Sequence, residues 1–373
     1  MDNHWLFALL PAILIAGQMS CSTNTPDISS LDVHAPKVYV EMQQEIQPKS
    51  EAQKTTCSMP LPYRGDLVFR SRYEGSDSAR DQINVQAEQD YSQKTKRFTE
   101  LQRFLANETD AIIKSGQDNG RIDCILRTLI RWQETGDLLQ PTKNHTGKAI
   151  RKWTLAAISA NLLKINHLAE KYDASTFAVV KIWVGALADQ VVRDYSDLPL
   201  KKINNHAYWA AWAVMTSAAL LDRKDLFSWS KQMFSTAMSQ VNNRGFLPNE
   251  LRRKSRALLY HNYALTPLVG IAAFLQANDQ DPFLPGKGGL QRLAGVVLEG
   301  INNQELFAKV TGVPQVPYDL YLHGRLSWLA IYFTLDHSFS KKMRAKIARI
   351  REKSMPLKSS RMGGDLGFLY LGR

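Results

Sequence analysis

The stretch AYWAAWAVMTSAALL, residues 207–221, is apolar around nearly its whole circumference. A helix at a protein surface shows one apolar stripe, whereas a helix that is apolar on all sides is enclosed by other elements. The segments 147–171 and 257–277 have the same character. Several enclosed helices favour a ring or barrel of helix pairs whose inner members are covered. A long enclosed groove would follow, and such a groove suits a polymeric ligand.

Helical periodicity extends over nearly every segment from Ser78 onward, which predicts an all-α chain of antiparallel hairpins joined by short loops. Breakers rich in Gly, Pro, Asn and Asp separate the segments, for example SGQDNG at 115–120. No strand-like alternation is sustained along the sequence. The predicted helices cover residues 79–115, 121–136, 147–171, 175–194, 205–222, 225–241, 251–277, 287–302, 324–336 and 341–352.

The N-terminus is typical of an exported protein. The run LFALLPAILIAG at 6–17 is apolar but too short for a comfortable membrane span, and small and polar residues follow it. No Lys or Arg precedes Leu6, and Gln18 and Met19 make a poor lipobox before Cys21. We therefore expect a signal peptide at 1–21 and a periplasmic protein. An outer-membrane lipoprotein anchored through Cys21 is the alternative.

The next segment, residues 22–60, is rich in Ser, Thr, Pro, Gln and Lys. This composition predicts a mobile leader, assigned to 22–56, before a single domain over 57–373. Once the signal is removed, Cys57 and Cys124 form an even pair in an oxidising compartment. We expect a disulfide between them, and two unpaired buried thiols are the alternative.

Charge and motif content limit the classes of function. The formal net charge of +12 favours an anionic partner, which could be nucleic acid, an acidic membrane surface or an acidic polymer. Export argues against nucleic acid. The sequence has no HExxH, CxxC, P-loop, dinucleotide fingerprint or GxSxG motif, and its eight His are scattered. We therefore expect no metal and no cofactor.

Four segments combine polar, basic and aromatic side chains near predicted helix starts or in loops. They are LVFRSRYEGSDSARD (67–81), NHTGKAIRKW (144–153), PLKKINNHAYWAAW (199–212) and GFLPNELRRKSRALLYHNYAL (245–265). The first is typical of a mobile loop or lid, with Gly75 giving mobility. The alternative is an ordinary connection in which Ser76 or Ser78 caps the next helix.

In the third segment, Asn204 or Asn205 is expected to cap the helix that follows. A helix N-terminus also offers free N–H groups and positive potential, which favour a bound carboxylate. With His206, Lys201 and Lys202 beside it, this helix start is predicted to be an anion site.

In the fourth segment, Arg253, Arg256 and Tyr260 are spaced to share one helix face. The alternative is a solvated basic face, made by Arg252 and Lys254, with the tyrosines packed inward. The four hydrogen-bonding side chains of YHNY, which begins at Tyr260, are costly to bury unless each finds a partner. A neighbouring Arg favours the phenolate of a Tyr, so Tyr260 is predicted to exchange a proton more readily near neutral pH.

At these segments the sequence resembles the periplasmic alginate lyases of polysaccharide lyase family 5. The matching runs include YEGSDSAR, NHTGKAIRKW, LPLKKINNHAYWAAW and GFLPNELRRKSRALLYHNYAL, in the same order over about residues 57–275. After residue 280 mainly RMGGD at 361–365 and the region around Trp328 remain similar. The resemblance implies an incomplete (α/α) toroid with a deep groove, and family members carry cysteines at both bridge positions. It also implies cleavage of poly-β-D-mannuronate by β-elimination without a metal, leaving a 4-deoxy unsaturated uronate at the new non-reducing end.

The resemblance also assigns residues to the site. The family's catalytic positions correspond to Asn205, His206, Arg253 and Tyr260. Its substrate-binding and lid positions correspond to Ser71, Arg72, Tyr73, His145, Thr146 and Tyr260, and a groove aromatic corresponds to Trp209. Family members usually carry Ser-Lys-Tyr in the lid, where this chain has Arg72 in the middle. Because Arg keeps the charge of Lys but not its shape, sugar preference or rate is expected to differ.

Two alternatives stay open at this stage. A glycoside hydrolase with a helical toroid would need two well-placed carboxylic acids, for which Asp194, Asp197 and Glu250 are candidates. A non-catalytic alginate-binding component of a secretion complex would keep the groove and lose turnover. The expected partner is alginate or polymannuronate rather than nucleic acid, with an alginate secretion complex as a further partner and the chain itself monomeric.

Overall fold

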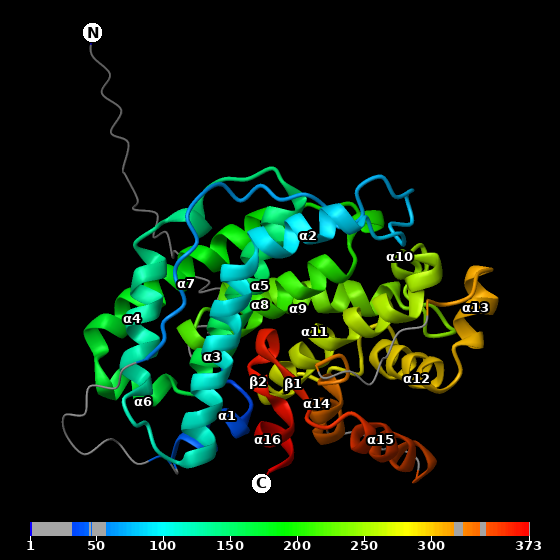
Figure 1. Ribbon diagram of the computed structural model, residues 1–373. Coiled ribbons are helices and arrows are strands. Elements are labelled where there is room, and N and C mark those ends of the chain that lie inside the picture. Colours follow the sequence, from blue (N-terminus) through cyan, green and yellow to red (C-terminus); the bar gives the residue numbers. More distant parts are fainter. Residues whose placement is uncertain (2–31, 45, 47–56, 317–323, 336–340, 373) are drawn as a thin grey trace. The chain divides into compact units, whose positions relative to one another are not determined.

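The computed structural model describes residues 1, 32–44, 46, 57–316, 324–335 and 341–372 (Figure 1). The predicted signal peptide, Cys21 and most of the predicted leader lie outside these residues. The α-helices are α1 (Lys37–Gln44), α2 (Val85–Lys94), α3 (Lys96–Ser115), α4 (Arg121–Gln133), α5 (His145–Leu163), α6 (Asn166–Tyr172), α7 (Ala174–Tyr195), α8 (Asn205–Leu221), α9 (Lys224–Gln240), α10 (Pro248–Leu251), α11 (Ala257–Ala277), α12 (Gly289–Asn302), α13 (Glu305–Thr311), α14 (Trp328–Thr334), α15 (Lys341–Lys353) and α16 (Leu366–Leu371). Two short strands, β1 (Lys358–Ser359) and β2 (Gly364–Asp365), pair antiparallel. The all-α prediction is confirmed.

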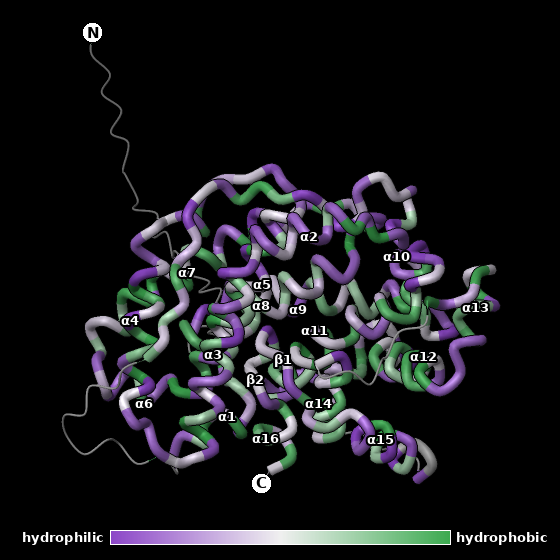
Figure 2. The backbone as a smooth tube through the Cα atoms, in the orientation of Figure 1, coloured by the Kyte–Doolittle hydropathy of each residue, from purple (hydrophilic) through white to green (hydrophobic). Residues whose placement is uncertain are grey.

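The enclosed helix quoted first is α8, and it is the centre of the fold. Nearly every residue of α8 is buried, and it packs against α5, α7, α9 and α11. The inner helices α5, α8 and α11 are in turn covered by α3, α7, α9 and α12 (Figure 1). This layering explains why the three apolar segments have no polar face, whereas the peripheral helix α15 carries mainly Lys and Arg and is largely hydrophilic in Figure 2.

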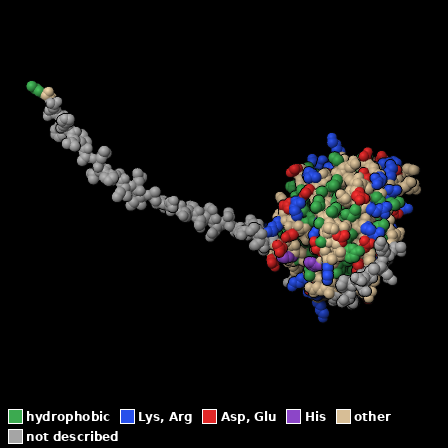
Figure 3. Space-filling model, turned by 90° about the vertical axis from the view of Figure 1, so that its left-hand side faces the viewer, with side chains coloured by type: hydrophobic (Ala, Val, Ile, Leu, Met, Phe, Trp, Pro, Cys, Tyr) green, Lys and Arg blue, Asp and Glu red, His purple; other side chains and the backbone are tan. Residues whose placement is uncertain are grey.

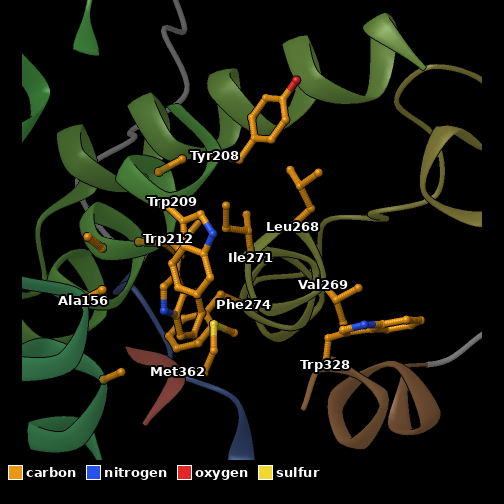
Figure 4. Packing of buried hydrophobic residues seen from close by; sticks show 14 of the residues in the cluster. Ala156, Tyr208, Trp209, Trp212, Leu268, Val269, Ile271, Phe274, Trp328 and Met362 are labelled. Atoms are coloured by element: carbon orange, nitrogen blue, oxygen red, sulfur yellow. The ribbon is translucent and has the colours of Figure 1, made fainter. Parts of the chain in front are cut away.

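Trp212 shows how closely the inner helices approach. Its indole lies with Trp209 and Met362 beside α11 (Figure 4), and its ring centroid is 5.6 Å from that of Phe274. A Cβ atom at Gly270 of α11 would lie only 2.7 Å from the Trp212 ring, so this contact requires glycine. The indole Nε1–H donates to the backbone oxygen of Arg361 at 2.9 Å, which ties the C-terminal segment to the core.

Three predicted helices are wrong in extent: 79–115, 147–171 and 251–277, the last because α11 begins only at Ala257. The segment predicted at 79–115 begins in a loop, where Arg80 has φ 49°, and becomes helical only after Asn84. The Asn84 side chain caps α2 by accepting a hydrogen bond from the N–H of Ala87 at 3.0 Å. The helix then breaks at Thr95 between α2 and α3, and the segment predicted at 147–171 divides likewise into α5 and α6.

Part of the predicted leader belongs to the helical body. Tyr39 of α1 is 1% exposed, and its ring centroid lies 5.8 Å from that of Phe274 and 6.3 Å from that of Tyr370. The N–H of Val33 donates to the Asp222 carboxylate at 2.8 Å. Composition failed here because a few buried side chains, Val33, Tyr39, Gln43 and Ile46, anchor a segment that is otherwise polar.

The predicted disulfide between Cys57 and Cys124 is confirmed, with the two Cα atoms 6.1 Å apart. It fastens the start of the domain to α4. The chain then continues from Cys57 toward the loop at 67–81, the predicted lid, which we call the lid loop.

Candidate active site

The lid loop is anchored on the N-terminus of α5. The side-chain oxygen of Asn144 caps α5 by accepting from the N–H of Gly147 at 2.7 Å, and it also accepts from the N–H of Phe69 at 3.3 Å. The Asn144 amide donates back to the Phe69 oxygen at 3.2 Å. A Cβ atom at position 147 would collide with the carbonyl oxygen of Leu67, so only glycine allows this crossing. The first turn of α5, with His145 and Thr146, therefore lies next to the loop.

Tyr260 contacts both the lid loop, through Tyr73, and the guanidinium of Arg253. Its hydroxyl donates to the hydroxyl of Tyr73 at 2.8 Å, although the two residues are 187 positions apart. The guanidinium carbon of Arg253 lies 3.8 Å from the Tyr260 ring centroid and 5.3 Å from that of Tyr73. Arg253 donates through Nη1 to the Ala79 oxygen at 3.3 Å, while its buried Nε has no partner in the described part of the chain. This orphaned donor is available to an anionic ligand.

The contact between Arg253 and Tyr260 does not arise from one shared helix face, so that prediction is wrong. Arg253 lies in the turn between α10 and a short 3₁₀ segment, whereas Tyr260 is in α11. The turn, rather than helical spacing, places the guanidinium over the phenol ring.

Burial raises the pKa of Tyr260 above its usual value, and the positive charge of Arg253 offsets only part of that shift. Arg253 does favour the phenolate, as predicted, but burial outweighs it, so the prediction that Tyr260 exchanges its proton more readily near neutral pH is wrong for the free protein. The predicted proton donor is present, but its ionised form is scarce at neutral pH.

The two asparagines at the start of α8 have separate tasks. The side chain of Asn204 caps the helix by accepting from the N–H of His206 at 2.9 Å, as predicted for one of the pair. The N–H of Asn205 donates to Glu250 at 2.7 Å, and its amide nitrogen lies 3.1 Å from both Glu250 carboxylate oxygens. The buried Oδ1 of Asn205 has no partner among the described residues. Lys201 and Lys202, which were predicted to join this site, are exposed.

His206 lies beside a buried lysine. Lys152 is 0% exposed, and its Nζ is 2.8 Å from His206 Nδ1 and 2.8 Å from the Tyr195 hydroxyl. The ring centroids of His145 and His206 are 4.4 Å apart. Burial, followed by the charge of Lys152, lowers the pKa of His206 well below its usual value. The imidazole of His206 is therefore neutral at pH 7.

Trp209 does not present its ring to a ligand, so its predicted role as a groove aromatic is wrong. It is 2% exposed, its Nε1–H donates to the Tyr263 oxygen at 3.2 Å, and its ring packs on that of Tyr263. The partly exposed indole near His206 is Trp153, with ring centroids 5.9 Å apart. The Arg361 guanidinium carbon lies 4.3 Å from the Trp153 ring centroid.

The remaining predicted binding residues lie in or beside the lid loop. Arg72 forms an ion pair with Glu88 and lies 5.8 Å from the Tyr91 ring centroid, so it reaches toward α2. The Ser71 hydroxyl accepts from the N–H of Tyr73 at 3.3 Å. Thr146 is partly exposed in the first turn of α5. Their roles in binding stay predictions.

Of the three carboxylates that a hydrolase would use, Asp197 is exposed, and Asp194 and Glu250 are engaged with protein partners. Asp194 is held in ion pairs with Arg151 and with Lys148, the latter at 3.4 Å. Glu250 is 0% exposed and bonded to Asn205, and burial raises its pKa. Within residues 57–316, 324–335 and 341–372, no cluster of three His, Cys, Asp or Glu side chains is placed to hold a metal ion.

Three further residues beside the site were not assigned to it from the sequence: Lys152, Trp153 and Arg361. Glu250, which was considered only as a hydrolase acid, lies there as a partner of Asn205. Lys152 and Trp153 fall inside the quoted segment 144–153, and Arg361 begins the RMGGD run. Only the resemblance to known lyases marked that last run, because a lone basic residue 101 positions beyond Tyr260 gives no spacing signal.

A helical toroid that gathers guanidinium, amide, imidazole and phenol groups, while Asp194 and Glu250 are engaged with protein partners, has the arrangement of a polysaccharide lyase. The alginate lyase family model matches residues 68–307, which is more than half of the chain. The chain therefore belongs to the alginate lyase family.

Relatives and solved structures agree with this assignment. An alginate lyase of Pseudomonas aeruginosa (strain LESB58) is 42% identical over 312 residues, 83% of each chain. One from Azotobacter vinelandii (strain DJ / ATCC BAA-1303) is 41% identical over 316 residues, 84% of this chain and 83% of the other. The fold is similar to that of alginate lyase A1-III from Sphingomonas species A1, an (α/α) toroid, with TM-score 0.74, 21% identity and coverage of 92% of this chain and 97% of that one. The predicted toroid is thereby confirmed.

Proposed function

We propose that this chain cleaves poly-β-D-mannuronate by β-elimination. The observation that carries the proposal is the stack of Arg253 on Tyr260, whose hydroxyl points at the lid residue Tyr73. A proton-transferring phenol, a cation against its ring and an orphaned guanidinium donor are what the elimination of a uronate requires.

The chemistry explains why cations must surround the phenol. The C5 proton of a uronate lies next to a carboxylate, so removing it adds negative charge beside a charge already present. Stabilising groups aimed at that developing charge lower the barrier most. The guanidinium of Arg253 and the imidazole of His206 supply that stabilisation in the proposed site. Asn205 is proposed to position this end of the site, because its own N–H groups donate to the Glu250 carboxylate.

The proposed step keeps its protons and electrons balanced. Tyr260 in its phenolate form takes the C5 proton, and the electron pair of the C5–H bond forms the C4=C5 double bond. The C4–O4 bond breaks, and O4 leaves with its electron pair. The reprotonated Tyr260 then gives its proton to O4, since in mannuronate C5–H and O4 lie on the same side of the ring. The products are a shortened chain and a 4-deoxy unsaturated uronate.

The two alternatives are less well supported. A hydrolase needs one free acid and one free carboxylate near the scissile bond, and Asp194 and Glu250 are both engaged with protein partners. A purely binding protein has no need for a phenol hydroxyl between Tyr73 and a stacked guanidinium. The exported N-terminal run favours the periplasm as the place of activity, with the chain acting as a monomer or beside an alginate secretion complex.

Digestion monitored in the ultraviolet tests the function. Polymannuronate should give a rise in absorbance from the unsaturated uronate, polyguluronate a smaller one, and a neutral glycan none. New reducing ends without the absorbance would show hydrolysis and contradict the elimination. Binding of polymannuronate with neither product would establish the binding protein instead.

The lid gives a second test. Arg72→Ala should lower affinity and turnover on polymannuronate while leaving the thermal unfolding temperature nearly unchanged. The ion pair with Glu88 is partly exposed, and such pairs contribute only about 0–1 kcal/mol. Arg70→Ala is the matched control, because Arg70 lies in the same loop and pairs with the exposed Glu74. Equal kinetic losses in both variants, or a large loss of stability with normal kinetics, would remove Arg72 from the binding site.

A further inference from the structure

The side chain of Lys152 has no place in the proposed elimination, yet it is fully buried beneath the site. Lys152 belongs to α5, and its Nζ bridges the Tyr195 hydroxyl of α7 and the Nδ1 atom of His206 of α8, each at 2.8 Å. The Nζ also faces the rings of Tyr195 and Trp153, with centroids 4.5 and 5.1 Å away. Burying a lysine is costly, so a role in organising the site is the natural explanation.

We propose that Lys152 holds His206 in the neutral tautomer that carries its proton on Nε2, so that His206 donates a hydrogen bond to the substrate and cannot be its base. The inference deepens the proposed function and rests on it for the identity of the substrate. The tautomer itself depends only on the contacts between the two side chains.

Both charge states of Lys152 lead to the same tautomer. An ammonium group only donates, so its contact with Nδ1 requires the lone pair of Nδ1 and leaves the ring proton on Nε2. A neutral amine has one lone pair, which the Tyr195 hydroxyl claims, because a phenol is a far stronger acid than an imidazole N–H. The amine then still donates to Nδ1.

The surroundings oppose a second proton on His206. The groups that face His206 are Lys152, the His145 ring, Arg80 and Arg253, all basic. Around Lys152 itself, Arg361 opposes a positive charge and Asp194 favours it. A neutral His206 ring with its proton on Nε2 accepts the hydrogen bond from Lys152 and adds no further positive charge among these basic groups.

The proposed tautomer of His206 gives His206 and Tyr260 different roles in the reaction. Nε2 of His206 has no hydrogen-bond partner in the described part of the chain, and the ring is partly exposed. An N–H there can donate to a uronate carboxylate and hold it while charge develops. Because this nitrogen has no free lone pair, the task of taking the C5 proton falls to Tyr260.

Two-bond proton–nitrogen correlation spectra of the full chain labelled with ¹⁵N-histidine test the proposal without substrate. His206→Gln identifies the signals of His206. His261 is an internal reference of the opposite kind, since the N–H of Leu247 donates to its Nε2 at 2.9 Å and its Nδ1 faces the Ala257 oxygen at 2.7 Å. At neutral pH His206 should show a protonated Nε2 and an Nδ1 that accepts a hydrogen bond, whereas His261 should show a protonated Nδ1.

Two substitutions establish whether Lys152 is responsible. Lys152→Met should move the Nδ1 resonance of His206 away from its hydrogen-bonded position and leave His261 unchanged, while Lys152→Arg, which can only donate, should keep the wild-type pattern. A protonated Nδ1 in the wild type, or an Nδ1 resonance unmoved in Lys152→Met, overturns the proposal. If Lys152→Met does not fold, the protonation of His206 Nδ1 or Nε2 in the wild-type spectrum tests the proposed tautomer by itself. Failure of the lyase proposal would instead appear in the digestion of polymannuronate, whatever the tautomer.

Discussion

Tyr260→Phe is expected to lower kcat on polymannuronate by about 10²–10⁴-fold, toward the upper end, because one hydroxyl is both base and acid. The substitution removes only the hydroxyl, so the ring keeps its contact with Arg253 and the helix α11 should still fold. Binding of oligomannuronate should change little, since the groups proposed to hold the carboxylate remain. Single-turnover rates and binding isotherms measure the two effects separately.

A matched control is available in Tyr208→Phe. Tyr208 is a buried tyrosine of α8 whose hydroxyl donates to Gln240 at 2.7 Å. Losing that hydrogen bond should cost stability, about 0.5–1.5 kcal/mol, and little activity. Near-normal turnover in Tyr260→Phe would show that the assignment is wrong. His206 would then be the better candidate for the base, which would require its other tautomer and so would contradict the role proposed for Lys152 as well.

The pH dependence of the wild type follows from the direction of the Tyr260 pKa. Because burial raises that pKa, the hydroxyl is protonated at neutral pH and the phenolate fraction grows as the pH rises. A reaction that begins from the phenolate should therefore show kcat/KM increasing from neutral into alkaline solution. A profile that falls over that range would contradict phenolate chemistry at Tyr260.

Structural features that depend on neighbouring residues could be predicted from the sequence, whereas long-range contacts could not. The apolar circumference of α8 predicts that the helix is buried, and Asn204 and Asn144 act as the N-caps that their residue type favours. The helix break at Thr95 has no such signal, because no glycine or proline marks it. The packing of Tyr39 against Phe274 is invisible as well, since it joins segments more than 200 residues apart.

In the candidate site, too, the residue types were predictable from the sequence and their contacts were not. The residue types that the elimination needs were found in sequence, and the structure brings Tyr73, Arg253 and Tyr260 together. Helical spacing could not predict that a turn stacks Arg253 on the phenol, nor that burial outweighs the charge of Arg253 in the pKa of Tyr260. Trp209 was misjudged for a related reason: a tryptophan near a helix start can face the groove or the core, and only the packing of Tyr263 decides.

Arg253→Ala is expected to lower kcat/KM on polymannuronate by about 10²–10³-fold, the usual loss when one group that stabilises developing negative charge is removed. Arg253→Lys should recover only part of the loss, because an ammonium keeps the charge but provides neither a planar group over the Tyr260 ring nor the donor at Nε. Steady-state kinetics on polymannuronate measure both effects.

The pH profile of Arg253→Ala separates electrostatics from simple binding. The positive charge of Arg253 lowers the pKa of Tyr260, so its removal should shift the alkaline rise of kcat/KM to still higher pH. Arg252→Ala is the matched control, since Arg252 is the adjacent arginine but is exposed and donates to the Lys201 oxygen at 3.5 Å. It should leave both rate and profile near those of the wild type. If Arg253→Ala loses no more activity than Arg252→Ala, or loses activity with an unshifted profile, the guanidinium does not tune the phenol, and the stack on Tyr260 only contributes to packing.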